Sequence, residues 1–286
     1  MRIVVLSPSN AWHYLDLKRA GAGRHEIVHA SFETISGGIA VAQPFSLNAD
    51  CVIVRIMPSG SLQQIIFRMD LLGQLAASGT LVLNSPRAIE IAVDKYLSLA
   101  RLHSAGIPVP ETRVSQDVES AVRDFEWMGG AVVTKPLFGS MGNGLIKLES
   151  LEAAIVCFES LVERGEVIYQ QAFVEHGGFD VRLLVIGDRV LGMKRVNGSH
   201  WITNISQGGV GESYQPSDAE AELAIAAAHA VGAEFAGVDL VRDVRTDRTM
   251  VLEVNAAPGW RGISQVLGLD VAAMMLDQVE RVAQTT

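Results

Sequence analysis

The chain has 286 residues, of which 49% are hydrophobic, so it is long and apolar enough for one large or two to three small domains and is not intrinsically disordered. A net charge of −9 and a pI near 5.3, without a run of Lys or Arg, exclude a nucleic-acid partner, because such a partner requires a basic surface. No membrane span is expected, since His229, Glu234 and Asp239 interrupt the most apolar stretch, residues 223–241.

The cysteines and the N-terminal segment indicate the compartment. Cys51 and Cys157 lie in apolar contexts without a CxxC or Cys/His spacing, which predicts reduced core residues and excludes a zinc site. The segment MRIVVLS lacks the charged region and the long apolar region of a secretory signal. We therefore expect a cytoplasmic protein with no membrane contact, whose partner is a small molecule.

The first 86 residues alternate apolar strands with helices. Strands are expected at residues 2–7, 26–31, 51–57 and 80–85, and helices near 10–20 and 62–77. Val- and Ile-rich strands with helical crossovers predict a small, mostly parallel, doubly wound α/β lobe. A dinucleotide-dependent oxidoreductase is disfavoured, because the first strand is followed by SPSNAW and the chain has no GxGxxG motif.

A helix near residues 87–103 then leads into a second unit. Gly106 is its expected stop, and Pro108 and Pro110 mark an extended linker. The second unit contains the strand AVVTKP, the turn-rich LFGSMGNG, a short strand LIKL, a helix near 151–164 and the strand EVIYQQAFV. We expect a small antiparallel layer with one or two helices.

The last part contains two pairs of strands. GFDVRLLVIGDRVLGMKRV predicts two alternating strands joined by a hairpin at Gly187 and Asp188. A helix opened by a capping box of Ser217 and Glu220 follows, then the strands AGVDLVR and TMVLEVN, and a final helix from near Val271. The predicted fold class is α/β overall, with an α+β arrangement after the first lobe.

The last strand pair places oxygen ligands on one face. In TMVLEVN, alternation sends Glu253 and Asn255 to the same side, and an antiparallel hairpin with a loop of about five residues sets Asp239 opposite Glu253. Carboxylates that close repel each other unless they share a cation or a proton, and three oxygen donors without His or Cys suit Mg²⁺. The alternative is that Arg242 or Arg261 pairs with these acids on a solvated face.

Mg²⁺ with a nucleotide also requires phosphate ligands, and the middle unit supplies candidates. Lys135 ends the strand AVVTK, and FGSMGNG offers flexible backbone N–H groups to a polyphosphate. It is not a Walker A loop, and a simple hairpin turn explains it equally well. Lys95 lies inside the predicted helix, where an exposed lysine is the simpler interpretation.

The order of these motifs resembles the ATP-grasp superfamily, and specifically the RimK-like carboxylate-amine ligases, which add glutamate or another amino acid to a carboxylate. The segments that carry the resemblance are AVDKYLSLARLHSAGIPVPET, VVTKP, FGSMGNG, YQQAFVEHGGFDVRLLVIGD, WITNISQGG, GVDLVR and LEVNAAPGWRGI. The resemblance covers residue 85 to the C-terminus. It implies a Rossmann-like pre-ATP-grasp domain (1–86), a connecting helix (87–106), a small lid subdomain (107–175) and a large C-terminal subdomain (176–286).

The resemblance implies roles for the matching residues. The ATP-binding set is Lys95, Lys135, Gly139, Ser140, Met141, Gly142, Gln171, Ala172, Phe173, Val174 and Asp180, in which the two lysines hold phosphates, the glycine-rich loop closes over them and residues 171–174 read the adenine. Two ions, Mg²⁺ or Mn²⁺, are implied on Asp239, Glu253 and Asn255. The implied catalytic residues are Arg182, Arg195 and Asn204, and the implied substrate residues are Gly208, Gly209, Asn255 and Gly259. Without the resemblance, an exposed strand position explains either arginine equally well.

The implied reaction is ATP-dependent activation of a carboxylate to an acyl phosphate, which an amine attacks to give an amide, ADP and phosphate. We expect a small-molecule carboxylate and an amino acid, with glutamate favoured, as substrates, and a homo-oligomer (dimer or tetramer).

Departures from the family leave the acceptor open. In the branch that modifies a ribosomal protein, arginines stand at the positions of Ile202 and Gln207, and an acid and an aromatic residue at those of Gln171 and Ala172. A ligase acting on a cofactor-like C1 carrier is therefore at least as compatible with the sequence as a protein-modifying one. A non-catalytic ATP-binding regulatory module and a kinase-like phosphotransferase are also compatible with an ATP-grasp scaffold.

Overall fold

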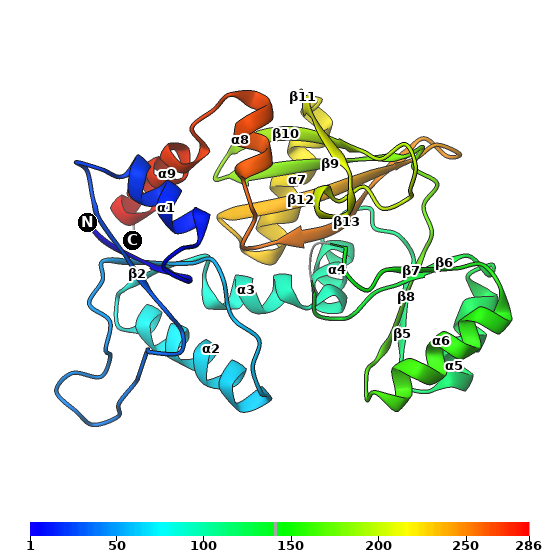
Figure 1. The fold of residues 1–286 in the computed structure, drawn as a ribbon, viewed down its shortest axis with the longest axis horizontal. Coiled ribbons are helices and arrows are strands. Elements are labelled where there is room, and N and C mark those ends of the chain that lie inside the picture. The colour runs from blue at the N-terminus through cyan, green and yellow to red at the C-terminus, as the bar shows by residue number, and fades with distance from the viewer. Residues whose placement is uncertain (140–141, 286) are drawn as a thin grey trace.

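The computed structural model describes residues 1–139 and 142–285, and in this part of the chain three β-sheets carry helices on their faces (Figure 1). A parallel sheet lies in the N-terminal part, a small antiparallel sheet in the middle part and a five-stranded antiparallel sheet in the C-terminal part. The mixed α/β architecture expected from the sequence is confirmed. Within the described residues, no helix combines the length and the apolar character needed to cross a membrane.

The N-terminal sheet has the order β2-β1-β3-β4, and all of its neighbouring strands are parallel. Its strands are β1 (Arg2–Leu6), β2 (Glu26–Ala30), β3 (Cys51–Val54) and β4 (Leu81–Leu83). Helices α1 (Trp12–Ala20) and α9 (Val271–Thr285) pack on one face, and α2 (Leu62–Ala77) packs on the other. Since β2 and β3 flank β1 on opposite sides, the order reverses there, and the carboxyl ends of β1 and β3 meet at a topological switch point.

The predicted connecting helix is two helices, α3 (Pro86–Val93) and α4 (Lys95–Ser104). Asp94 separates them because its backbone is extended (φ −88°, ψ 104°) and its carboxylate caps α4 by accepting a 3.0 Å hydrogen bond from the Leu97 N–H. The expectation of one continuous helix is therefore wrong, whereas Lys95 does lie in a helix. Lys95 is the first residue of α4, and from this end of the helix its Nζ reaches the carbonyls of Leu137 and Gly139.

The middle sheet is antiparallel and has the order β5-β8-β6-β7, as expected. Its strands are β5 (Thr112–Ser115), β6 (Val132–Thr134), β7 (Ile146–Leu148) and β8 (Ile168–Ala172). Helices α5 (Val118–Trp127) and α6 (Leu151–Glu163) cover one face, where Phe125 and Phe158 meet edge to face. Both cysteines are free, with Cys51 buried and Cys157 half-buried.

The large sheet has the order β11-β10-β9-β12-β13, and in the view of Figure 1 it lies above the middle sheet. Its strands are β9 (Phe179–Ile186), β10 (Arg189–Val196), β11 (Val210–Tyr214), β12 (Phe235–Asp243) and β13 (Arg248–Asn255). One face packs Val181, Leu183 and Val238 against α7 (Asp218–Val231). Because side chains alternate along a strand, Asp180, Arg182 and Asp239 are directed to the opposite face.

Four elements had no predicted range: β5 and α5 of the middle unit and two short ones further along the chain, β11 and α8 (Arg261–Leu267). β11 is an edge strand whose residues are half-buried or exposed, so VGESY carries little apolar alternation. Helix α8 has no side-chain cap and directly follows the Pro-Gly turn. Both short elements depend on tertiary packing, and local sequence signals are weak in such segments.

Asn84 joins the N-terminal sheet to the large sheet. Its Nδ2 donates to the carbonyls of Phe235 (2.7 Å) and Ala256 (2.5 Å), and its Oδ1 accepts from the N–H groups of Glu234 (2.8 Å) and Phe235 (2.9 Å). Asn84→Ala is expected to lower the free energy of unfolding by about 2–4 kcal/mol, because it leaves buried backbone groups unpaired. Urea denaturation measures this loss. A change below about 0.5 kcal/mol would show that water replaces the amide.

Candidate active site

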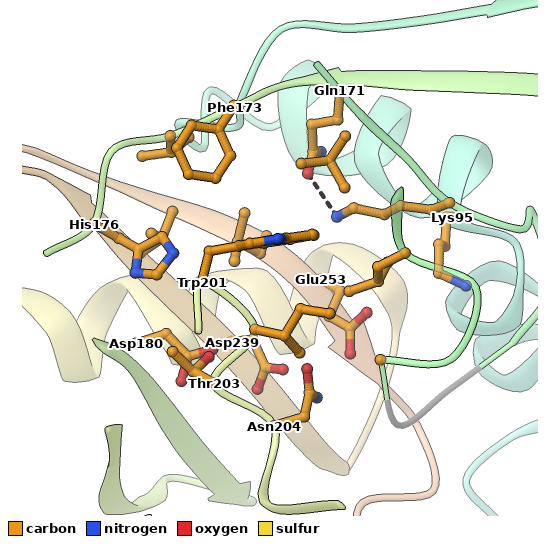
Figure 2. Close-up of a pocket in the computed structure, with 18 of the residues that line it drawn as sticks. Lys95, Gln171, Phe173, His176, Asp180, Trp201, Thr203, Asn204, Asp239 and Glu253 are labelled. Carbon is orange, nitrogen blue, oxygen red and sulfur yellow. Dashed lines mark hydrogen bonds between the residues drawn. The ribbon is translucent and has the colours of Figure 1, made fainter. Parts of the chain in front are cut away.

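A pocket lies between the middle sheet and the large sheet (Figure 2). It encloses about 870 Å³ of atom-free space, its open mouth included. Most of the residues that the sequence predicted for a site line it: Lys95, Lys135, Gly139, Gly142, Gln171, Ala172, Phe173, Val174, Asp180, Arg195, Asn204, Asp239 and Glu253. The hinge segment, the lysines and the acids therefore share one cavity.

The other predicted residues are placed differently. Arg182, Asn255, Gly208, Gly209 and Gly259 are not part of the described pocket lining, although Arg182 and Asn255 bond to residues that are. Ser140 and Met141 lie outside the described residues.

The hairpin of β12 and β13 sets Asp239 directly opposite Glu253, as the sequence predicted. On its other side, Asp239 is in register with Arg182 of β9, and Asp180 of β9 is in register with Arg195 of β10. Four adjacent strands thus carry a row of charges of mixed sign across one face of the sheet. A β-bulge after Asp239, which was not predicted, shifts the later pairing of the hairpin.

Asp239 is the centre of this row. Arg182 donates to it through Nε (2.6 Å) and Nη2 (2.8 Å), and Arg195 donates through Nη2 (2.9 Å). Arg195 also donates through Nε to Asp180 (2.7 Å). Burial by itself raises the pKa of Asp239, but the two guanidinium groups outweigh this effect and hold the pKa below its ordinary value.

The two arginines are structural partners of the acids as well as candidates for binding substrate. Arg195 and Asp239 are each 3% exposed, so the interpretation of Arg195 as an exposed strand residue is wrong. Arg242, one of the alternative partners suggested by the sequence, does not take this place, since it pairs with Asp247. Any metal or ligand bound by these acids would therefore share them with these salt bridges.

The acids and the nearby amide fit Mg²⁺ by their chemistry. Glu253 is half-buried and accepts a 2.8 Å hydrogen bond from the Asn255 amide. Asp239 Oδ2 already accepts from both arginines, whereas Asp239 Oδ1 accepts from Arg182 alone and keeps a lone pair for a metal ion. Among the described residues, no three His, Cys, Asp or Glu side chains converge to hold a metal ion by themselves. Phosphate oxygens and water must complete the coordination, which is how Mg²⁺ is usually held beside a nucleotide.

Two lysines face the acids across the pocket. Lys135 Nζ donates to the Gln171 side chain (2.6 Å), and Lys95 Nζ donates to the carbonyl of Gly139 (2.9 Å) at the start of the glycine-rich loop. Burial lowers the pKa of both ammonium groups, that of Lys135 to about 8, and Glu253 partly opposes the effect. Because the hydrogen-bond acceptors of both ammonium groups are neutral oxygens, an anion such as a phosphate would bind them favourably.

The apolar wall includes residues that the sequence did not single out. Trp201 lies across the pocket, with Phe173 and Gln171 on one side and Asp239 and Thr203 on the other (Figure 2). The Phe173 and Trp201 rings meet edge to face at 6.0 Å. Further apolar lining comes from Val133, Leu145, Val174, Val241 and Leu252. Trp201, Thr203 and His176 were missed because the loops that carry them have no periodicity from which a direction could be read.

The glycine-rich loop contacts the loop that carries Trp201 and Asn204. A Cβ on Gly142 would lie 2.8 Å from Asn204 Oδ1, and Asn143 Oδ1 accepts a 3.1 Å hydrogen bond from Gln207. The φ of 73° at Gly142 also disfavours other residues. Gly209 packs so closely on Thr203 O that a Cβ would overlap it.

Comparison with known proteins identifies the family. Residues 92–279 match the model of the RimK-like ATP-grasp domain, which is more than half of the chain. The tetrahydromethanopterin:alpha-L-glutamate ligase of Methanosarcina acetivorans is 31% identical over 261 residues, which cover 82% of this chain and 80% of that protein.

Solved structures agree on the fold. The ATP-grasp RimK domain protein of Sphaerobacter thermophilus superposes with a TM-score of 0.78 at 26% identity and covers 97% of this chain and 99% of its own. The ATP-grasp ligase PsnB, solved with a minimal precursor, Mg and ADP, has a TM-score of 0.75 at 22% identity and covers 99% of this chain and 97% of its own. Both likenesses extend over the N-terminal lobe as well as the two sheets that bound the pocket.

Proposed function

The chain belongs to the RimK-like ATP-grasp family and is an ATP-dependent ligase, and on this premise we propose that it joins glutamate to a carboxylate of a small, cofactor-like molecule. The observation that carries the proposal is the row of Asp239 and Glu253 beneath a pocket that also holds Lys95 and Lys135. The proposed metal ligands and the proposed phosphate-binding cations thus line one cavity, as Mg-ATP binding requires. A relative named as a tetrahydromethanopterin:alpha-L-glutamate ligase supports a small-molecule acceptor.

The residues divide the work between binding and positioning. Residues 171–174 with Phe173 and Leu252 enclose the base, and Lys95 and Lys135 bind the phosphates. Asp239, Glu253 and Asn255 would hold two Mg²⁺ or Mn²⁺ ions, which neutralise charge on the transferred phosphoryl group. Asn204 lines the pocket where the acyl group would lie, and Arg182 and Arg195 keep the acids in place.

No nucleophile of the protein is needed for this chemistry. The substrate carboxylate attacks the γ-phosphorus of ATP, ADP leaves, and the glutamate amine then displaces phosphate from the acyl phosphate while it loses a proton. The protein contributes orientation and a site from which water is largely excluded.

The three sheets support the expected domain organisation. We assign residues 1–86 to the pre-ATP-grasp domain, 107–175 to the lid and 176–286 to the large subdomain, joined by residues 87–106. Free thiols support the expected cytoplasmic location.

The homo-oligomer (dimer or tetramer) stays a prediction. Analytical ultracentrifugation measures the oligomeric state.

The test of the proposed function is mass spectrometry of a small-molecule host extract incubated with the enzyme, ATP, Mg²⁺ and isotopically labelled glutamate. A labelled product heavier than its precursor by one glutamate residue, formed together with ADP, supports the ligase and identifies the acceptor. A phosphorylated product formed without glutamate contradicts the proposal in favour of a phosphotransferase. ATP binding without a product supports the non-catalytic module.

The lowered pKa of Lys135 predicts how nucleotide affinity depends on pH. Only the protonated amine attracts phosphate, so the Kd for Mg-ADP is expected to be constant below about pH 7 and to rise up to tenfold per unit above the pKa of about 8. Titration calorimetry measures this profile. Lys135→Arg should flatten it, because a guanidinium stays protonated. A wild-type Kd that does not change up to about pH 9.5 would show that Lys135 does not contact the phosphates.

A further inference from the structure

Two buried arginines outside the pocket have no acidic partner among the described residues. Arg55 directly follows β3 and Arg68 lies on α2, and each is 5% exposed. Their donors meet carbonyls instead: Arg55 Nη2 donates to Pro258 O, and Arg68 Nη1 donates to Pro58 O at 2.6 Å. Arg55 Nε has no hydrogen-bond partner. Burying a cation without a counter-charge costs free energy of folding. The two arginines therefore indicate a binding site for an anion.

Both guanidinium groups lie at the carboxyl edge of the N-terminal sheet. Arg55 is at the end of β3, beside the switch point between β1 and β3, where open α/β sheets bind their ligands. Arg68 reaches the same β3–α2 connection through its bond to Pro58. A Cβ on Gly60 would lie 2.9 Å from Gln64 Oε1 and 3.1 Å from Arg68 Nη1, so a larger residue here would crowd both side chains.

The large subdomain forms the opposite wall. The Arg55 guanidinium stacks over the Trp260 ring at 4.7 Å and binds Pro258, and both residues belong to the turn that follows Asn255. Pro258 and Asn255 both lie against Gly237. A Cβ added to this glycine would be 3.1 Å from the Pro258 Cβ and 3.7 Å from the Asn255 Cβ. The residues that contact Arg55, Pro258 and Trp260, therefore follow the proposed metal ligand Asn255 by only three and five positions in the chain.

The groups around Arg55 do not neutralise it. His13 stacks edge to face on Trp260, and burial together with Arg55 lowers its pKa to about 3, so it is uncharged. Asp16, the acid of α1 on this side, is engaged by the Trp260 indole N–H (2.8 Å) and by Arg19 (2.8 Å). Arg55 thus keeps its positive charge for a ligand.

We propose that Arg55 and Arg68 form a subsite for a substrate carboxylate that is not the one phosphorylated. The proposal rests on the ligase function and assigns its second recognition point. Two sources share this chemistry: the α-carboxylate of the incoming amino acid and an additional carboxylate of the acceptor. The planar fork of arginine suits a carboxylate, which it binds through two parallel hydrogen bonds.

The test uses three variants of the full-length enzyme. Arg68→Gln removes one cation, and Arg55→Lys keeps the charge but removes the fork. Arg87→Gln is the matched control, because Arg87 is an exposed arginine that pairs with Glu90 on α3. Retained Mg-ADP binding shows that a variant is folded.

Each protein is first dialysed against labelled L-glutamate in the presence of Mg-ADP. ADP release is then measured while glutamate is varied at a fixed amount of extract, and while extract is varied at fixed glutamate. A KM for glutamate raised about tenfold or more in both subsite variants, with an unchanged extract curve, supports the amino-acid source, and the reverse pattern supports the acceptor source.

The outcomes separate this subsite from the proposed function. If the glutamate and extract saturation curves of both subsite variants coincide with those of Arg87→Gln, the subsite is overturned and the ligase proposal is unaffected. Glutamate binding that the wild type shows and both variants lose, without product from any extract, supports the subsite while the ligase proposal fails. A wild type that neither retains glutamate nor forms product contradicts both.

Discussion

Glu253→Ala is expected to lower kcat for ligation by about 10³-fold or more while leaving the protein folded. The side chain faces Asp239 across the hairpin and is a proposed ligand of both metal ions, so its loss removes charge stabilisation from the phosphoryl transfer. Its structural contacts are few: one hydrogen bond from Asn255 at 2.8 Å and Arg182 Nη2 at 3.8 Å. The cost in the free energy of unfolding is therefore only about 1 kcal/mol.

Asp247→Asn is the matched control for this experiment. Asp247 lies in the turn of the same hairpin and forms an exposed pair with Arg242, so its substitution removes one negative charge without touching the pocket. ADP release and amide formation are measured for both variants, with thermal melting as the fold check. Turnover in the Glu253 variant within tenfold of the control would place the metal site elsewhere.

The sequence was most informative where chemistry and periodicity coincided. Alternation in TMVLEVN and VDLVRD predicted that Asp239 faces Glu253, and the register of β12 and β13 confirms it. The parallel N-terminal sheet and the antiparallel middle layer were also predicted, because short apolar strands separated by turn residues define them locally. Lys135 and the glycine-rich segment were candidates from the residues themselves, and the resemblance added Lys95 and the hinge; most of these residues line one pocket.

The sequence was least informative where long-range contacts decide the structure. The break at Asp94 depends on a single carboxylate competing for a backbone N–H group, which a helical pattern hides. Trp201 reaches the pocket from an irregular loop. The pairing of Arg182 and Arg195 with Asp239 depends on the order β10-β9-β12, which brings together residues 57 and 44 positions apart in the chain. No local pattern encodes that order.

Asp239→Asn is expected to abolish ligation as well, but for a reason that also reduces stability. Asp239 is 3% exposed and accepts hydrogen bonds from both Arg182 and Arg195, so a neutral amide leaves two guanidinium groups with too little negative charge. Removing one partner of a buried ionic group costs about 3–5 kcal/mol. Urea denaturation of the wild type and the variant measures the difference, and Asp247→Asn should cost no more than about 1 kcal/mol because its pair is exposed.

The depressed pKa of Asp239 fixes the sign of the pH dependence. Its contribution to stability is present above the ordinary Asp pKa of about 3.9 and is lost as the pH falls through the lower folded value. The gap between wild type and variant should therefore be constant near neutral pH and shrink in acid.

A second substitution separates the charge effect from loss of packing. In Asp239→Asn with Arg182→Gln, one unpaired guanidinium is gone, so part of the lost stability should return while ligation stays abolished. Additive losses in the double variant would mean that Asp239 and Arg182 are not coupled. The acids would then stabilise the sheet by packing alone, and the charge row could not be what holds the metal ligands in position.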